Sequence, residues 1–198
     1  MKSVLVVYAT TEGQTRKIAE LIAAALAERG FDAGLVDSAS DAAAMVQPVC
    51  AAAVVCGSVH RHRYQRALVR FVKDNAGWLA GIPTAFVAVS LTAAGRDERG
   101  RADLQEIVAA FCRRTGWAPT IIRHVAGALR YTQYNFVEKW MLRRIASEQG
   151  GDTDTSRDHE YTDWDDVTRF VGEFVATAGL QPDGHHVADP TAGTAATD

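Results

Sequence analysis

Five short apolar runs, separated by segments with the periodicity of amphipathic helices, constrain the fold of this chain more than any other feature. The runs lie at 3–8, 31–36, 51–56, 84–89 and 120–126, and each is short enough to be a buried strand. Alternation of strand and helix predicts parallel strands joined by right-handed crossovers, with helices on both faces of the sheet. We therefore expect an α/β fold with a doubly wound, five-stranded parallel sheet.

Four stripes of apolar residues have helical spacing. They are Ile18, Leu21, Ile22 and Ala25; Tyr64, Leu68, Phe71 and Val72; Leu104, Ile107, Val108 and Phe111; and Val167, Phe170, Val171, Phe174 and Val175. Thr162 and Asp165 have the spacing of a capping box, which predicts the start of the last helix. Residues 127–160 separate the fifth strand from this helix by far more than an ordinary loop, so we expect a structured insertion there.

Length, charge and composition exclude several classes of protein. A chain of 198 residues predicts one domain over 1–180, with 181–198 as a disordered tail because that segment lacks apolar periodicity. A net charge of −3 provides no basic field that would attract nucleic acid. No apolar stretch approaches the roughly 20 residues of a membrane span and no signal peptide precedes the first strand, so we expect a cytoplasmic protein. The three cysteines form no CxxC pair, and His185 and His186 have no further ligands at suitable spacing, so we expect no metal site.

A polar turn follows the first strand, and ligands of a doubly wound sheet bind at the carboxyl ends of its strands. The turn and the start of the next helix contain Thr10, Thr11, Glu12, Gly13, Gln14 and Thr15. Such a turn exposes backbone N–H groups and hydroxyls at a helix N-terminus, which suits a phosphate dianion. The chain contains neither GxxxxGK[ST] nor GxGxxG, so we expect a single terminal phosphate. The other interpretation is an ordinary Thr/Gly helix cap.

The turn at 10–15 resembles the phosphate loop of flavodoxins, which holds the phosphate of FMN, although Glu12 stands where flavodoxins usually carry Thr. We expect the Glu12 carboxylate to point to solvent, because it would repel a phosphate. The resemblance implies the sheet order 2-1-3-4-5 and two further FMN loops. These loops would supply Ser58, Val59, His60 and Tyr64 after the third strand, and Ser90, Leu91, Thr92, Ala93 and Gly95 after the fourth. The last loop carries no aromatic residue, so we expect one flavin face to be open to an organic substrate.

The second half of the chain resembles a narrower family. The segments "AGALRY" at 126–131, "GGDTDT" at 150–155 and "YTDW" at 161–164 are similar to the flavodoxin-like, quinone-linked protoporphyrinogen oxidases. The resemblance extends over about residues 1–178. It implies an FMN-dependent oxidoreductase of haem biosynthesis that oxidises protoporphyrinogen IX to protoporphyrin IX and passes the electrons to a quinone such as menaquinone. In such an enzyme the protein binds and orients the flavin and the substrate, since the redox chemistry belongs to the cofactor.

The propionates of a porphyrinogen require cations around an apolar platform. The candidate substrate-binding residues are Arg61, Arg63, Arg130, Tyr131, Trp140 and Arg143. Each of these arginines could instead belong to a solvated surface. His60 is a candidate proton acceptor, since imidazole titrates near neutral pH, and the alternative is an exposed loop histidine.

Residues 135–148 have the pattern of an amphipathic helix with aromatic and basic side chains. Such a helix can lie at a membrane interface, here the inner face of the cell membrane, close to a quinone pool. It can equally dock on the core of the domain or join two subunits of a homo-oligomer.

Two other functions are compatible with the same loops. A flavodoxin-like electron carrier would act with a protein partner and stabilise a one-electron semiquinone; the long insertion and the third loop without an aromatic residue count against it. A flavodoxin-fold interaction protein that has lost FMN would stay colourless after purification.

Overall fold

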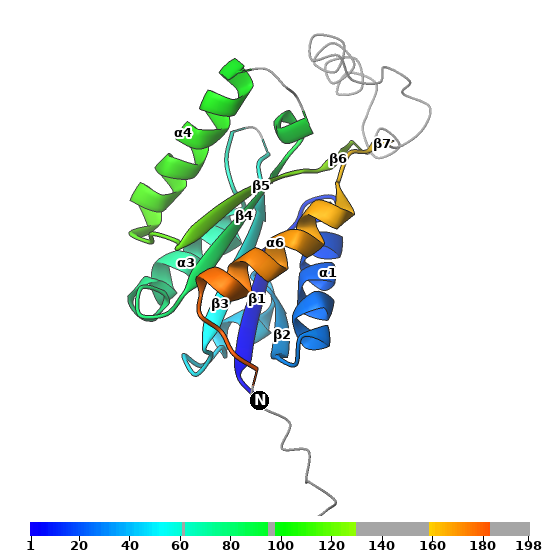
Figure 1. Ribbon diagram of the computed structural model, residues 1–198. Helices are drawn as coiled ribbons and strands as arrows, with labels where there is room; N and C mark the ends of the chain where they lie inside the picture. Colours follow the sequence, from blue (N-terminus) through cyan, green and yellow to red (C-terminus); the bar gives the residue numbers. More distant parts are fainter. Residues whose placement is uncertain (61, 95–97, 130–158, 183–198) are drawn as a thin grey trace, which may run out of the picture.

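The computed structural model describes residues 1–60, 62–94, 98–129 and 159–182. Its central sheet has five strands in the order β2-β1-β3-β4-β5, with every neighbouring pair parallel (Figure 1). The strands are Ser3–Ala9 (β1), Asp32–Asp37 (β2), Ala52–Ser58 (β3), Thr84–Ser90 (β4) and Ile121–Ala126 (β5). The predicted fold and strand order are confirmed, and strand ends differ from the predicted ones by one or two residues.

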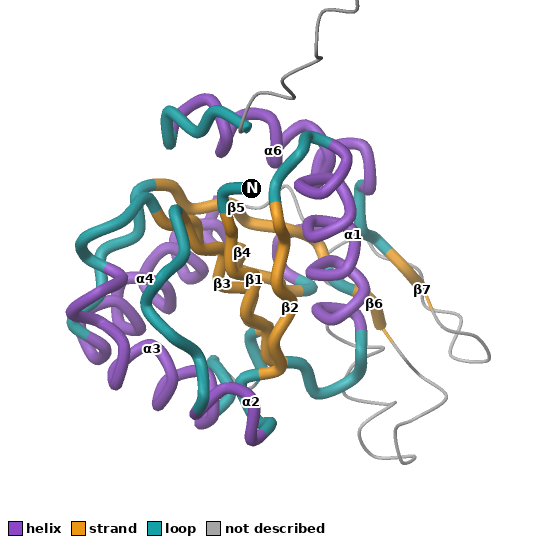
Figure 2. Tube along the Cα trace, turned by 90° about the horizontal axis from the view of Figure 1, so that it is seen from below, coloured by secondary structure: helices purple, strands orange, loops and turns teal. Residues whose placement is uncertain are grey.

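Helices cover both faces of the sheet. They are Gln14–Glu28 (α1), Asp41–Ala44 (α2), Arg66–Leu79 (α3), Glu98–Thr115 (α4) and Trp164–Thr177 (α6), with a short 3₁₀ helix at Thr92–Ala94 (η1). Helices α1 and α6 lie on one face, and α3 and α4 lie on the other (Figures 1 and 2). The order of the strands reverses between β1 and β3, so the loops that follow these two strands flank the switch point of the sheet.

The core has two halves because successive side chains of a strand point to opposite faces. Val6 of β1 packs in one cluster with Ile22 of α1 and Phe174 of α6. Val7 packs in the other cluster with Phe111 of α4 and with the side chains of α3. Strands β1, β3 and β4 are buried along almost their whole length, which is typical of a parallel sheet that is covered on both faces.

Two details of the predicted helices are wrong. Tyr64 continues a helical stripe in the sequence, but α3 begins at Arg66, so Tyr64 lies in the preceding loop. The capping box at Thr162 is also absent, because Asp163 is the N-cap of α6 and its carboxylate accepts a hydrogen bond from the Asp166 N–H at 2.8 Å. The Thr162 hydroxyl is instead used in a contact between distant elements.

The ends of the predicted insertion form a two-stranded antiparallel ribbon of Ala128–Leu129 (β6) and His159–Glu160 (β7). This ribbon continues from β5, where the Gly127 N–H donates to the Ser90 carbonyl at 3.0 Å. The predicted helix at 135–148 and most of the predicted tail lie outside the described residues. Among the helices that the structure describes, none is long and apolar enough to span a lipid bilayer.

Candidate functional site

The turn between β1 and α1 leaves the first amides of the helix without a side-chain cap. Gly13 is the N-cap residue, with a φ of 89°, a left-handed conformation that favours glycine. The Thr10 Oγ1 accepts a hydrogen bond from the Gly13 N–H at 2.8 Å, so this hydroxyl holds the turn. No acidic residue lies in the first turn of this 15-residue helix. Its free N–H groups carry the positive end of the helix dipole, which suits an anion.

Side chains at this turn differ in burial. Gln14 and Thr15 are buried at the start of α1, whereas Thr11 is exposed. Glu12 is partly buried. The Oε1 atom of Gln14 is buried and has no hydrogen-bond partner within the described part of the chain. A buried acceptor without a partner is costly, so a ligand that donates a hydrogen bond here would be stabilised.

The loop after β3 begins with a tight turn. The Val59 N–H donates to the Val89 carbonyl at 2.8 Å, which ties the start of the loop to β4. His60 and Arg63 then exchange two backbone hydrogen bonds, of 2.9 and 3.1 Å, and His62 adopts a φ of 62°. The side chains of His60, His62 and Arg63 are exposed. Arg61, a predicted substrate-binding residue, lies outside the described residues.

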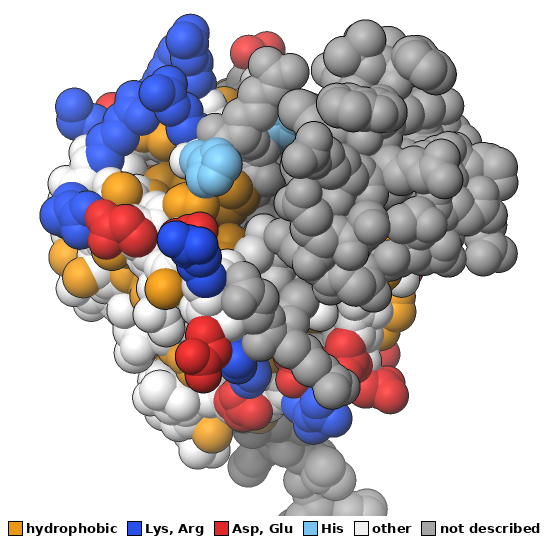
Figure 3. Space-filling model, turned by 90° about the horizontal axis from the view of Figure 1, so that it is seen from above, with side chains coloured by type: hydrophobic (Ala, Val, Ile, Leu, Met, Phe, Trp, Pro, Cys, Tyr) orange, Lys and Arg blue, Asp and Glu red, His pale blue; other side chains and the backbone are white. Residues whose placement is uncertain are grey.

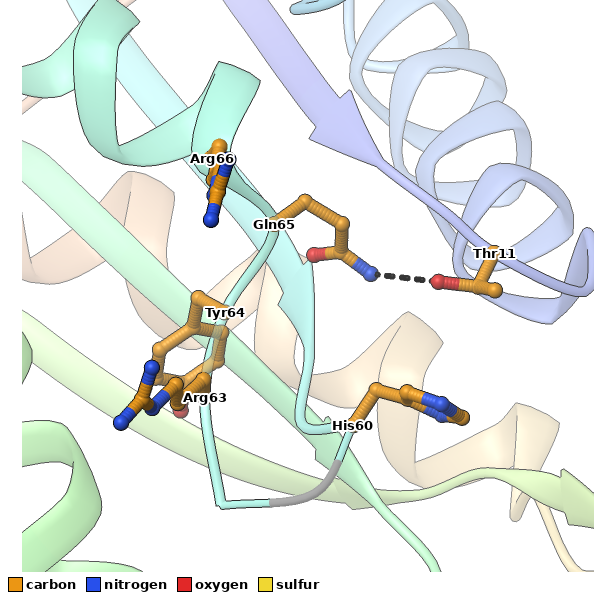
Figure 4. A pocket seen from close by; sticks show the side chains of 6 residues that line it. All are labelled: Thr11, His60, Arg63, Tyr64, Gln65 and Arg66. Carbon is orange, nitrogen blue, oxygen red and sulfur yellow. Dashed lines mark hydrogen bonds between the residues drawn. The ribbon is translucent and has the colours of Figure 1, made fainter.

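Gln65 connects the loops after β1 and β3, and no motif in the sequence indicates this role. Its Nε2 donates to Ser58 Oγ at 2.7 Å. It also donates to Thr11 Oγ1 at 3.1 Å (Figure 4). Its Oε1 is buried and has no partner among the residues described. Gln65 is the N-cap residue of α3 but makes no side-chain cap there. The available signal was its position just before a helix, which by itself indicates no ligand.

The Tyr64 ring belongs to the core. It packs against Phe86 with ring centroids 5.1 Å apart and edge-on against Phe111 at 4.8 Å, and it is 7% exposed. Burial raises the pKa of its hydroxyl above the ordinary value of a tyrosine. The Oη atom has no hydrogen-bond partner in the described part. Only a small part of this side chain is therefore available to a ligand.

The loop after β4 is small and polar. The Ser90 Oγ accepts a hydrogen bond from the Ala93 N–H at 3.1 Å, and the Ala94 N–H donates to the Leu91 carbonyl at 3.0 Å. The described residues of this loop, 90–94, include no aromatic side chain, and Leu91, Thr92 and Ala93 are partly buried. Gly95 lies outside the described residues. A flat ligand against this loop would be covered by backbone and small side chains.

The base of the insertion is joined directly to the first loop. The Thr162 hydroxyl accepts from Gln14 Nε2 at 2.9 Å and donates to the Ala126 carbonyl at 2.8 Å, so it links α1 to β5. Glu160 pairs with Lys17 of α1 at 3.2 Å and accepts from Trp164 Nε1 at 2.8 Å. These contacts fix the two ends of the insertion beside the candidate phosphate loop. The predicted substrate residues Arg130, Tyr131, Trp140 and Arg143 lie between those ends and outside the described residues.

A cleft of about 630 Å³ opens beside these loops, within the range of roughly 300–1,000 Å³ that is usual for ligand sites. It is lined by Thr11, His60, Arg63, Tyr64, Gln65 and Arg66 (Figure 4). In Figure 4, Gln65 reaches toward Thr11, and Arg63 lies beside Tyr64 on the side away from His60. Because the cleft combines hydroxyls, an amide and two arginines at the switch point of the sheet, these residues fit a phosphate-bearing flat cofactor such as FMN.

Cysteine and histidine chemistry elsewhere in the described chain is limited. The thiol of Cys56 is fully buried in β3, and burial raises its pKa, so it is not a reactive thiolate. His124 of β5 is half-buried, burial lowers its pKa, and its Nδ1 has no partner among the described atoms. No group of three or more potential metal ligands occurs in the residues that the structure describes.

Comparison with known proteins gives the chain a family. A family model described as a flavodoxin domain matches residues 5–156. The chain is 31% identical over 172 residues to protoporphyrinogen IX dehydrogenase (quinone) of Escherichia coli, which covers 85% of this chain and 92% of that protein. It is also 31% identical over 172 residues to the protein of the same name from Leishmania major, covering 87% of this chain and 74% of that relative.

Solved structures share the fold of this chain. Oxidised flavodoxin 2 from Bacillus cereus superimposes with a TM-score of 0.55 at 15% identity, covering 88% of this chain and 98% of that one. A single-substitution mutant of the flavodoxin from Pseudomonas aeruginosa gives a TM-score of 0.54 at 16% identity, with 89% and 99% coverage. At these identities the likeness shows the fold alone. From the family model and the two relatives, the chain belongs to the flavodoxin-domain family and is similar over most of its length to the quinone-linked protoporphyrinogen IX dehydrogenases.

Proposed function

We propose that this protein is an FMN-dependent oxidoreductase that oxidises protoporphyrinogen IX to protoporphyrin IX and passes the electrons to a quinone. The observation that carries the proposal is the 31% identity to protoporphyrinogen IX dehydrogenase (quinone) of Escherichia coli, which extends over 85% of this chain. The uncapped N-terminus of α1 and the cleft beside it support the choice of FMN.

In this proposal the three loops divide the work of binding. The free amides at the start of α1, with Thr10 and Thr11 beside them, hold the phosphate. Gln65 fixes the distance between the first loop and Ser58, so that the cofactor meets a preformed site. The small residues after Ser90 leave room for an organic substrate against one flavin face.

When bound, FMN supplies the ring that accepts electrons from the substrate. Oxidation of the porphyrinogen proceeds in successive two-electron steps, and each step converts one quinone to a quinol that takes up two protons. In this proposal His60, which is exposed and lines the cleft, accepts a proton that leaves the substrate. Arg63 and Arg66 bring positive charge to the same cleft, where the acidic side groups of the substrate need counter-charges.

The acceptor that we propose is a membrane-dissolved quinone such as menaquinone, which requires the protein to reach a lipid surface. The sequence of 135–148 supports this contact, because it combines apolar, aromatic and basic residues at helical spacing. We place the protein in the cytoplasm, at the inner face of the cell membrane. The same segment is the first candidate for a contact between two subunits.

The proposal is tested by porphyrin formation under anaerobic conditions. The FMN-loaded protein should convert protoporphyrinogen IX to fluorescent protoporphyrin IX at a rate that depends on added quinone. Gly13→Val serves as the control, because a branched side chain is strained at this left-handed φ and should disrupt the phosphate loop. A wild-type rate equal to that of the control would overturn the substrate assignment. A stable semiquinone with rapid transfer to a reductase protein would favour the electron-carrier alternative.

A further inference from the structure

A second cleft, of about 340 Å³, lies between α3 and α4 next to the candidate flavin cleft. Its floor is apolar and includes Val69 of α3 and Ile107 and Phe111 of α4. Arg63 and Tyr64 line both clefts, so the two cavities meet at these residues. A ligand that extends out of the larger cleft can therefore enter the smaller one without crossing the protein core.

The rim of the second cleft is cationic. Arg63 and Arg114 line it and are exposed, and neither has a carboxylate partner within the residues that the structure describes. The neighbouring Arg113 differs, because it pairs with Glu106 at 2.6 Å. In Figure 3, which views the molecule from above, Lys and Arg side chains gather along one margin of the described surface, close to apolar and histidine side chains. Arg63 and Arg114 therefore bring positive charge to an apolar floor, and no described carboxylate pairs with either of them.

A buried hydroxyl without a partner supplies independent evidence for a ligand. Tyr64 is 7% exposed, and its Oη finds no hydrogen-bond partner in the described chain. Figure 4 shows this side chain directly beside Arg63. A buried hydroxyl in that state carries the cost of lost hydration, which a bound acceptor would remove. Arg63, Tyr64 and Arg114 all line this cleft.

We propose that the cleft between α3 and α4 binds a carboxylate-bearing edge of the substrate, with Arg63 and Arg114 as counter-charges and Tyr64 as the hydroxyl donor. The inference rests on the proposed function, because a porphyrinogen carries two propionates on an apolar macrocycle. A volume of about 340 Å³ is near the lower end of small-molecule sites, so the cleft holds one edge of a large ligand. The macrocycle then lies over the larger cleft. Arg114 becomes a specificity-determining residue that no sequence motif indicates.

The test compares a porphyrin that carries the carboxylates with one that lacks them. The probes are protoporphyrin IX and its dimethyl ester, and binding to the FMN-loaded protein is followed by tryptophan fluorescence quenching. Arg114→Ala should weaken binding of the free acid roughly fivefold, as expected for a partly exposed ion pair, and leave binding of the ester unchanged. Tyr64→Phe, which keeps the ring in the core, should also weaken binding of the acid alone. The matched control is Arg113→Ala, which should change neither.

Kinetics separate this inference from the proposed function. In the oxidation assay, Arg114→Ala should raise the KM for protoporphyrinogen IX by about the same factor as it raises the dissociation constant of protoporphyrin IX. The kcat of this variant should equal that of the wild type. The cleft assignment alone would be overturned if the wild type oxidises the porphyrinogen but Arg114→Ala weakens binding of the acid and the ester equally, or weakens binding of neither. A wild type that binds neither porphyrin and oxidises no porphyrinogen would overturn the proposed function and the cleft assignment together. Circular dichroism and the unfolding midpoint of each variant verify that it is folded.

Discussion

Replacing Gln65 should weaken FMN binding, because its side chain joins two parts of the candidate site. The Gln65 amide donates to Ser58 Oγ at 2.7 Å and to Thr11 Oγ1 at 3.1 Å, so it joins the end of β3 to the turn after β1. The first hydrogen bond is partly buried and the second is exposed, so together they contribute about 1–2 kcal/mol, at roughly 0.5–1.5 kcal/mol each. If this energy preorganises the site, its loss raises the dissociation constant of FMN roughly 5–30-fold.

The assay is a titration of apoprotein into FMN, followed by flavin fluorescence. Gln65→Ala removes the side chain, and Gln65→Met keeps its length but removes both hydrogen bonds, so both variants should bind FMN more weakly. Gln105→Ala, at an exposed position of α4, is the matched control and should bind as the wild type does. Dissociation constants within twofold of the wild type for both Gln65 variants would refute the reasoning.

Three further predictions concern stability. Gly57→Ala places a Cβ 2.5 Å from Leu68 Cδ2, so the free energy of unfolding, measured in urea, should fall by about 1–3 kcal/mol. Gly34→Ala is the control, because its Cβ would have its nearest neighbour at 4.0 Å, and it should change the free energy of unfolding little. Thr162→Val removes the hydroxyl that joins α1 to β5 through hydrogen bonds of 2.9 and 2.8 Å. The free energy of unfolding should fall by about 1–2 kcal/mol, and an unchanged unfolding midpoint would contradict this prediction. Burial lowers the pKa of His124 below 6.5, so the unfolded state binds its proton more tightly and stability falls as pH drops through about 6.5. His124→Gln should flatten that part of the pH profile of the unfolding free energy, and a profile with the same slope would show that other groups cause it.

Local periodicity predicted the fold of this chain, because an apolar run or stripe is visible in a single segment. The features that were missed depend on contacts between distant segments. Thr162 has capping-box spacing, but its hydroxyl bonds to α1 and β5 and leaves the cap to Asp163. Tyr64 continues an apolar stripe, although it lies in the loop before α3.

The candidate site likewise combines features that are visible in one segment with contacts between distant segments. The first loop could be predicted from the residue types that follow β1, whereas Gln65 gains its role only when the loops after β1 and β3 meet. Arg114 carries no signal in the sequence, because its place beside Arg63 depends on how α4 packs against α3. The substrate residues predicted within 130–143 stay predictions.

The most direct test of the central claim is an anaerobic stopped-flow mixing of the FMN-loaded protein with protoporphyrinogen IX, with no quinone present. The visible absorbance of oxidised FMN should bleach in step with the appearance of porphyrin intermediates, and later addition of a quinone should restore it. Flavin that stays bound and oxidised after mixing would contradict the claim that this protein oxidises porphyrinogens. Failure to retain FMN at all would contradict the assignment of the turn at 10–15 as a phosphate loop.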